Sequence, residues 1–173
     1  MSTFETATGK MSFKILPKEI RKRFNGSISY QAIDATEKWV YTKFQVIYTA
    51  ANILAGAGAV ADDDYLMSPG TSVGVADKYR FLIIKHTGYE DTNENSASPF
   101  GVILTINNDT PAYDDANLLF LAPGDTMALK LPNLTVEGLH AMTCKISNGI
   151  PSAASVEGEN ALIEIAAILD DVA

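Results

Sequence analysis

The 173-residue sequence has a single cysteine, Cys144, and this scarcity bears on where the chain folds. One cysteine cannot form an internal disulfide, and chains without disulfides are typical of a reducing cytoplasm. An apolar run is also missing from the first residues, MSTFETATGKMSFK, so a secretory signal is not expected. We therefore predict a protein that folds in the cytoplasm.

Long hydrophobic runs are absent as well. No run approaches the roughly 18 apolar residues that a membrane-spanning helix needs, so we predict no membrane partner. The composition is ordinary for a soluble protein, with 47% hydrophobic and 20% charged residues. A chain of this length suggests one domain, which buries roughly 70% of the surface exposed by its unfolded form.

Basic residues are scarce outside the N-terminus. Residues 1–25 have a net charge of +4, from six basic and two acidic residues, whereas residues 26–173 have a net charge of −12. The acidic part argues against a nucleic-acid partner, because phosphate contacts need clustered Lys and Arg. The basic part suits an acidic protein partner, and a solvated tail is the alternative interpretation.

A complete motif for catalysis or cofactor binding is missing. The stretch GAGAVA (56–61) matches a G-x-G-x-x-A fingerprint, but the DDDYLMSPG that follows begins no helix and its acids would repel a pyrophosphate. His86 and His140 have no metal-binding spacing between them, and no G-x-S-x-G elbow occurs. We predict no enzyme activity, no cofactor and no metal.

Two further features have a structural and a functional interpretation. The acidic clusters 62–64, 90–91 and 114–115 contain the oxygen ligands that calcium prefers, but none has EF-hand spacing, so solvated loops are the favoured interpretation. Cys144 alternates with Met142 and Ile146 on an apolar face. That pattern predicts a buried thiol rather than a nucleophile.

Short apolar runs bounded by Gly, Pro, Asn and Asp fill most of the chain. In LLFLAPGDTMALKL (118–131), Pro123 and Gly124 predict a type II turn, and the alternation after it predicts a strand, so we expect a hairpin. Further strands are predicted at 38–50, 77–88, 100–109, 138–149 and 160–171. The alanines of the last stretch also suit a helix, but the body has no other helical pattern, which favours a strand.

These runs predict an all-β fold over residues 37–173, an antiparallel β-sandwich or barrel, with a second sheet expected to cover the apolar strands. Residues 1–36 are predicted to be an N-terminal arm and linker. The expected core residues are Phe81, Ile83, Val102, Leu104, Ile106, Phe120, Met127, Leu129, Leu131, Met142 and Ile146.

The stretch LPKEIRKRF (16–24) departs from the β pattern. Pro17 suits the first turn of a helix, and apolar residues recur after it at four-residue spacing. So short a helix is marginal in water, and we expect it to gain order against a partner. The NGSISYQAID that follows is expected to be a linker or a short extra strand. The predicted partner-binding residues are Leu16, Ile20, Arg21, Lys22, Arg23 and Phe24.

The stretches KYRFLIIKHTG, FGVILTINND and LLFLAPGDTMALKLP resemble the strand rhythm of small virion proteins of tailed bacteriophages, above all capsid decoration, or cement, proteins. The resemblance is one of pattern, covers roughly residues 38–172 and assigns no residue a role. It implies a jelly-roll-like β-sandwich, assembly in the host cytoplasm and a place in the virion. It also implies binding to the major capsid protein or other virion subunits, often as a homo-oligomer.

Two other classes of function remain open. A phage tail or fibre component that binds a host glycan would have clustered exposed aromatic residues. A cellular β-sandwich enzyme or carbohydrate-binding module would have a pocket of converging acids or histidines.

Overall fold

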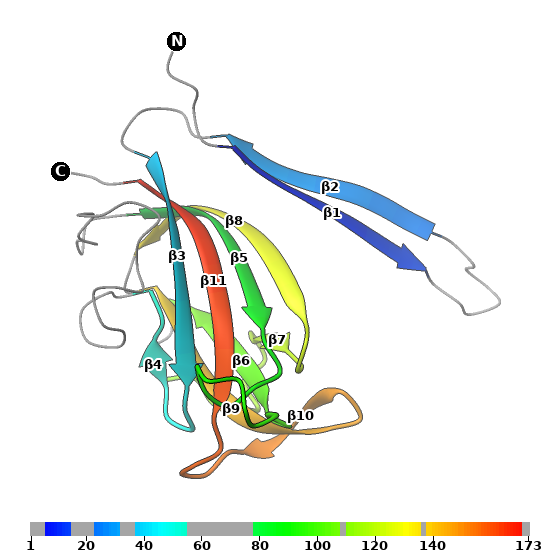
Figure 1. Ribbon diagram of the computed structural model, residues 1–173, viewed down its shortest axis with the longest axis vertical. Coiled ribbons are helices and arrows are strands. Elements are labelled where there is room, and N and C mark those ends of the chain that lie inside the picture. The colour runs from blue at the N-terminus through cyan, green and yellow to red at the C-terminus, as the bar shows by residue number, and fades with distance from the viewer. Residues whose placement is uncertain are drawn as a thin grey trace.

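The computed structural model describes residues 6–14, 23–31, 37–54, 78–107, 110–135 and 138–170. These residues form eleven strands and no helix (Figure 1). The strands are β1 (Thr6–Lys14), β2 (Arg23–Gln31), β3 (Glu37–Val46), β4 (Ala51–Asn52), β5 (Lys78–His86), β6 (Gly101–Ile106), β7 (Leu119–Leu121), β8 (Thr126–Thr135), β9 (Leu139–Ser147), β10 (Ile150–Ala154) and β11 (Ala161–Asp170).

Strands β3 to β11 form two antiparallel sheets that face each other. The first sheet has the order β3-β11-β5-β8. The second has the order β10-β9-β6-β7, and β4 also pairs with β9. Strands β1 and β2 pair only with each other, as a separate hairpin.

The strand pairs of the two sheets are nested in the sequence. β3 pairs with β11, β4 with β9, β5 with β8, and β6 with β7. Strands nested in this way are paired as in one long hairpin, with the first strand opposite the last. Successive pairs alternate between the two sheets. The pairings of β11 with β5 and of β6 with β9 then complete the sheets. This is the jelly-roll arrangement, so the predicted fold class is confirmed.

Strand β11, in the interior of the first sheet, shows how alternation in the sequence corresponds to the two faces of a sheet. β11 lies between β3 and β5, and Ile163, Ile165 and Ala167 pack into the space between the sheets. Glu164 and Ala166 alternate with them and belong to the outer face. The predicted strand is therefore confirmed, and its alanines are compatible with a strand that has neighbours on both sides.

The turn in LLFLAPGDTMALKL is confirmed, but the predicted hairpin is wrong. Gly124 has a φ of 87°, which a type II turn requires at this position, and the Asp125 N–H donates to the Ala122 carbonyl at 2.9 Å. However, β7 pairs with β6 and β8 pairs with β5. The turn therefore takes the chain from one sheet to the other. The two strands that flank it, β7 and β8, belong to different sheets and do not pair with each other.

Acidic side chains stabilise this turn and two others. The Asp115 carboxylate accepts a hydrogen bond from the Ala112 N–H at 2.8 Å, and the Asp115 N–H donates to the Ala112 carbonyl at 3.1 Å. Turns 122–125 and 156–159 repeat both bonds with an acidic fourth residue. The carboxylate at each of these positions satisfies a backbone donor of its own turn.

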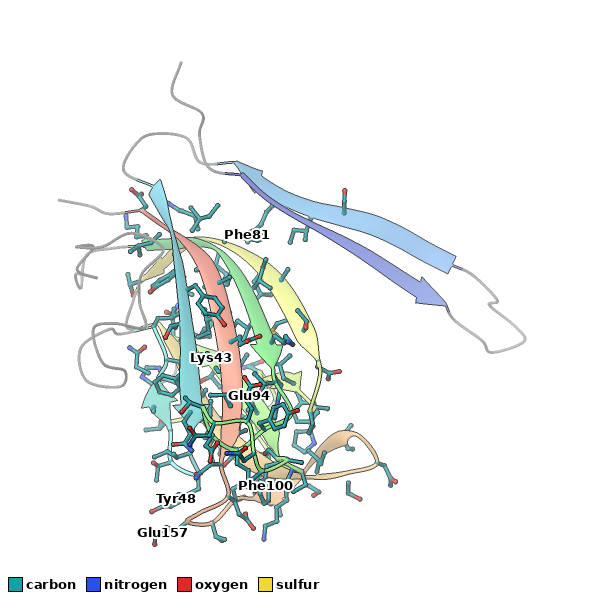
Figure 2. The ribbon with its side chains drawn as sticks, viewed as in Figure 1. Lys43, Tyr48, Phe81, Glu94, Phe100 and Glu157 are labelled. Carbon is teal, nitrogen blue, oxygen red and sulfur yellow. The ribbon has the colours of Figure 1, made fainter. Side chains whose placement is uncertain are left out.

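Buried side chains form three clusters, one between the sheets and one on the outer face of each (Figure 2). The inter-sheet cluster contains Phe44, Val46, Ile53, Leu54, Tyr79, Leu82, Ile84, Val102, Leu104, Leu121, Leu134, Leu139, Ala141, Ala161, Ile163, Ile165, Ala167 and Leu169. The second cluster joins Phe81 and Ile168 to Ile28, Ile83 and Ala128. The third joins Ile103, Met142 and Cys144 to Tyr113, Leu118, Phe120 and Ile146.

Ten of the eleven predicted core residues belong to these clusters. Phe81, Val102, Leu104 and Met142 are buried, and six others are partly buried against them. Ile106 is the exception, because it ends β6 and is 38% exposed. The alternation within β6 was extended one residue too far in this prediction.

Candidate partner-binding site

The N-terminal hairpin stands apart from the two-sheet body. β1 and β2 pair in register from Thr6 opposite Gln31 to Lys14 opposite Arg23. In Figure 1 the hairpin begins near the start of β3, and β1 runs from there out past β8, away from the body. Lys14 and Arg23 therefore mark its distal end.

The predicted helix is wrong where the structure can test it. Arg23 and Phe24 belong to strand β2, and the register sets Phe24 opposite Phe13. Leu16, Ile20, Arg21 and Lys22 lie outside the described residues. The four-residue spacing of apolar residues suggested a helix. Such local spacing contains no information about a strand partner eleven residues earlier in the chain, as Phe13 is for Phe24. The alternative of an extra strand after residue 24 is confirmed, since β2 continues to Gln31.

The register of the hairpin separates its residues into two faces of opposite character. Residues directly opposite each other, and alternate residues along a strand, belong to one face. One face thus combines the pairs Ala7–Tyr30, Gly9–Ile28, Met11–Gly26 and Phe13–Phe24. The other combines Thr6–Gln31, Thr8–Ser29, Lys10–Ser27, Ser12–Asn25 and Lys14–Arg23. The hairpin is an apolar face backed by a polar and basic one.

Ile28 joins the apolar face of the hairpin to the body. It packs against Phe81 of β5 and Ile168 of β11, both fully buried on the outer face of the first sheet. Figure 2 labels Phe81 at the end of the sheet nearest the hairpin. Side chains of the hairpin are described for residues 26–28, and of these Ile28 belongs to a cluster of the body.

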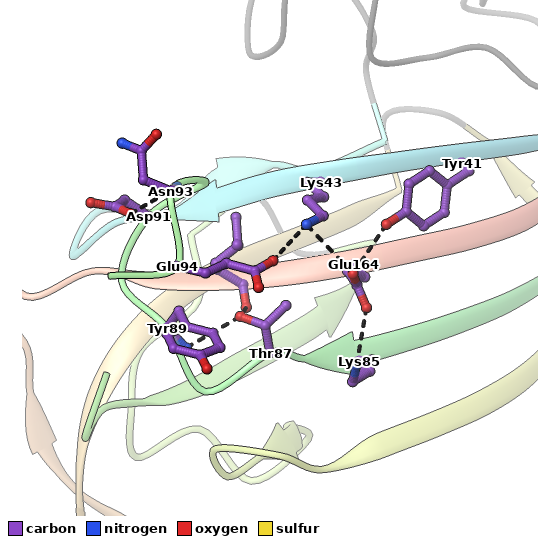
Figure 3. Close-up of polar contacts among 10 residues, drawn as sticks. Tyr41, Lys43, Lys85, Thr87, Tyr89, Asp91, Asn93, Glu94 and Glu164 are labelled. Carbon is purple, nitrogen blue, oxygen red and sulfur yellow. Dashed lines mark hydrogen bonds and ion pairs between the residues drawn. The ribbon is translucent and has the colours of Figure 1, made fainter. Parts of the chain in front are cut away.

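The same outer face carries a charged network beyond these apolar residues (Figure 3). Glu164 of β11 accepts hydrogen bonds from Tyr41 at 3.1 Å and from Lys85 at 3.2 Å. Lys43 lies between two carboxylates, with its Nζ 2.6 Å from Glu94 and 3.8 Å from Glu164. Three strands and the loop after β5 are tied together by this network.

The network shifts the pKa values of its members. Burial acts to raise the pKa of Glu164, but the hydrogen bonds from Lys85 and Tyr41 and the charges of Lys85 and Lys43 together lower it. Burial and the bond to Glu164 raise the pKa of Tyr41. The bond to Glu94 raises the pKa of Lys43. The charged forms of Glu164 and Lys43 are thus stabilised by opposite partners, whereas Tyr41 is held in its neutral form, which donates to Glu164.

The two histidines and the cysteine lie inside the body. His86 is fully buried at the end of β5, whereas His140 is half-buried on β9 of the opposite sheet. Cys144 is fully buried in the third cluster, and burial raises the pKa of its thiol to about 11. The prediction of a buried, unreactive thiol for Cys144 is thus supported by both its position and its acidity.

Some of the motifs found in the sequence lie in segments that the structure does not describe. The GAGAVA stretch and the acidic triplet 62–64 lie outside the described residues. Within the described ranges, no three His, Cys, Asp or Glu side chains are grouped closely enough to hold a metal ion. No helix capable of crossing a membrane occurs in those ranges either.

The hairpin was missed as a functional element, although the sequence contains a signal for it. In TATGKMSFK and RFNGSISYQ, polar and apolar or small residues alternate at the period of a strand. The run of basic residues between them obscured this alternation. Reading both stretches at period two would have placed Phe13 and Phe24 on one face.

Comparisons with known proteins found little. No protein-family model matches the sequence, and no curated protein matches it. Among solved structures, the chain is similar to the coat protein of tobacco streak virus, with a TM-score of 0.42 and 9% sequence identity. The superposition covers 82% of this chain and 90% of the coat protein.

Proposed function

We propose that this chain is a non-enzymatic structural protein of a tailed-bacteriophage virion, which binds the capsid surface and stabilises or decorates the shell. Residues 37–173 form the body in this proposal, and residues 1–36 form an attachment arm and its linker. The hairpin β1–β2, which leaves the body with an apolar face, is the observation that carries the proposal.

The fold is compatible with this role without deciding it. Jelly rolls serve as viral capsid domains, lectins and cupins, so the fold alone does not assign a function. The arm is more informative. A two-stranded hairpin is marginally stable by itself in water, and it gains stability when a partner covers its apolar face.

Charge indicates the partner. The distal end of the hairpin has Lys14 opposite Arg23, and the eight residues that join them add three basic residues and one acidic residue. The basic arm therefore suits an acidic surface. The chain supplies such a surface itself, because residues 26–173 have a net charge of −12. We propose that the arm binds the body of a second copy and that the resulting homo-oligomer binds the major capsid protein.

The function is tested by co-sedimentation with capsids of the encoding phage from which this protein has been stripped. The full chain is expected to pellet with the capsids, and the chain lacking residues 1–31 is expected to lose at least tenfold in affinity. Binding should weaken with salt, because the Debye length falls to about 8 Å at physiological ionic strength. A full chain that stays in the supernatant at every salt concentration would exclude the capsid role.

The role of the arm is tested by sedimentation equilibrium of the protein alone. Arg23→Glu reverses a charge at the distal end of the arm, and Lys130→Glu makes the same reversal on an exposed residue of the body. We expect the first to dissociate the oligomer and the second to leave it intact. Equal effects, or a full-length chain that is monomeric, would show that the arm does not join copies.

A further inference from the structure

The loop of residues 87–100 folds back over the start of β11 (Figure 3). It connects β5 in one sheet to β6 in the other. The Leu162 N–H donates to the Tyr89 carbonyl at 2.7 Å, and the Thr87 N–H donates to the Leu162 carbonyl at 2.9 Å. Leu162 shares the outer face with Glu164 by alternation, yet it is fully buried. The loop therefore closes on an apolar position of the sheet.

One imidazole ring holds both ends of this loop. The Nε2 of His86 lies 2.9 Å from the Phe100 carbonyl at the end of the loop. The Gly88 N–H, at its beginning, donates to Nδ1 of the same ring at 3.0 Å. Because Nδ1 accepts a hydrogen bond, it has no proton of its own and the ring is neutral. The proton of the ring is on Nε2, which donates to the Phe100 carbonyl. The Ser98 N–H donates to the Gly88 carbonyl at 2.8 Å and closes the base again.

Protonation of His86 would remove one of the two hydrogen bonds by which its ring holds the loop. A second proton on Nδ1 would point at the Gly88 N–H, so the bond to Gly88 would be replaced by repulsion between two donors. The charge would also lie in a fully buried position. Opening the loop relieves both costs, since it exposes the ring to water.

We propose that His86 is an acid-sensitive clamp, which holds loop 87–100 closed in its neutral form and releases the loop on protonation while the sandwich stays folded. Release would separate Glu94 from Lys43 and uncover Leu162. The clamp thereby makes the exposure of one surface of the body depend on pH. It rests on the geometry of the loop and is independent of the role proposed for the hairpin.

The groups around His86 favour its neutral form on balance. Burial lowers the pKa of His86, and the bond to Phe100 and the charge of Asp125 oppose that shift. Asp125 lies in the β7–β8 turn, and its carbonyl accepts the His86 N–H at 2.9 Å. β11 presents apolar Ile163 beside it, while the neighbouring Lys85 pairs with Glu164 on the outer face.

The sign of the pH dependence follows from this direction. In the open loop the pKa of His86 is expected near its ordinary value of about 6.5. The closed loop has the lower value, so closure is favoured fully above about pH 6.5 and weakens as the pH falls below it. The opening equilibrium is expected to rise by up to about tenfold per pH unit there.

Amide hydrogen exchange of the full chain between pH 7 and pH 5, corrected for intrinsic rates, tests the clamp. The amides of Gly88, Ser98 and Leu162 are expected to lose at least tenfold in protection over this range. The amides of Ile103 and Met142, in the β6–β9 pair, should keep theirs. Flat protection in the loop, or loss in both regions together, would overturn the proposal.

Two controls assign the effect to one ring. His86→Gln removes the titrating group, and His140→Gln removes the other histidine of the chain. The pH dependence should vanish in the first variant and persist in the second. If His86→Gln does not fold, the NMR titration of the His86 ring in the unaltered protein replaces it. Its midpoint must lie below 6.5 and match that of loop exchange, and a mismatch would equally overturn the clamp.

Discussion

The body and the hairpin both have strands with alternating apolar residues, but they differ in how those apolar residues are covered. In the body, each sheet packs its inner face against the other, and further side chains cover both outer faces. The hairpin has an equally regular alternation, and Ile28 is its described contact with the body. The body is therefore stabilised from within, whereas the hairpin depends on what lies outside it.

This difference separates what a substitution does to folding from what it does to assembly. Free energy lost in the body should appear as reduced stability of the isolated chain. Free energy lost in the hairpin, outside the Ile28 contact with the body, should appear only when its partner is present. Each prediction below tests one side of that division, beginning with the largest effect.

Leu104→Ala should destabilise the body most. Leu104 is fully buried between the sheets, and truncation of such a side chain costs about 2–5 kcal/mol. The loss is measured by urea unfolding. Ile106→Ala on the same strand is the matched control, because Ile106 is 38% exposed, and it should cost much less. Equal losses would mean that the register of β6 is wrong.

Gly101→Ala tests how tightly the outer layer of the body is packed. A Cβ at Gly101 would contact the Phe120 ring and approach Cγ2 of Ile146 to 2.8 Å. Overpacking of this kind costs about 1–3 kcal/mol. Gly26→Ala in the hairpin is the control, since nothing lies within 4 Å of a Cβ built there. A neutral Gly101→Ala would indicate that the layer is loosely packed.

Glu164→Gln should lower the free energy of unfolding by less, and only at a pH at which the Glu164 carboxylate is ionised. The side chain of Glu164 is 24% exposed, so its ion pairs contribute no more than about 1 kcal/mol. Because its pKa is lowered in the folded state, this contribution is present above the ordinary value of about 4.5 and is lost as the pH falls through the lowered one. Urea unfolding at pH 7 and pH 3 should show the difference only at pH 7.

Phe24→Ser should have the smallest effect on the isolated chain. Phe24 is next to the distal end of the hairpin, and we expect a change in unfolding free energy within about 0.5 kcal/mol. Ile28→Ser removes the contact with Phe81 and Ile168 and should cost about 1 kcal/mol. Labelling of the buried Cys144 thiol reports opening of the body in both variants. Faster labelling in Phe24→Ser than in Ile28→Ser would contradict this division.

The sequence predicted the elements of the body better than their pairing. Alternation located β5, β6, β9 and β11, and Pro123-Gly124 located a turn. The sequence did not reveal that β7 and β8 belong to different sheets, because a turn specifies a change of direction and not the partners of its strands. Pairing depends on burial against residues far away in the chain.

The candidate site was predicted less well, for a related reason. Charge separated residues 1–25 from the body, and that separation needs no structure. The conformation of Arg23 and Phe24 depends instead on β1, which pairs with them across the hairpin. Local spacing in LPKEIRKRF could not represent that pairing, and the structural role of Asp115 in a turn was hidden within an acidic cluster in the same way.

The nested pairing of the body also fixes the order in which the chain can fold during synthesis. The hairpin pairs residues close in sequence and can form as soon as they leave the ribosome. β3 must wait for β11, because residues that bond across this strand pair, such as Tyr41 and Glu164, are 123 positions apart. At roughly 5–20 residues per second, that delay lasts about 6–25 s. During this interval β3 lacks its partner, and closing so long a loop makes the final step slow. The residues of the arm are therefore complete, and can meet a partner, before the body behind them exists.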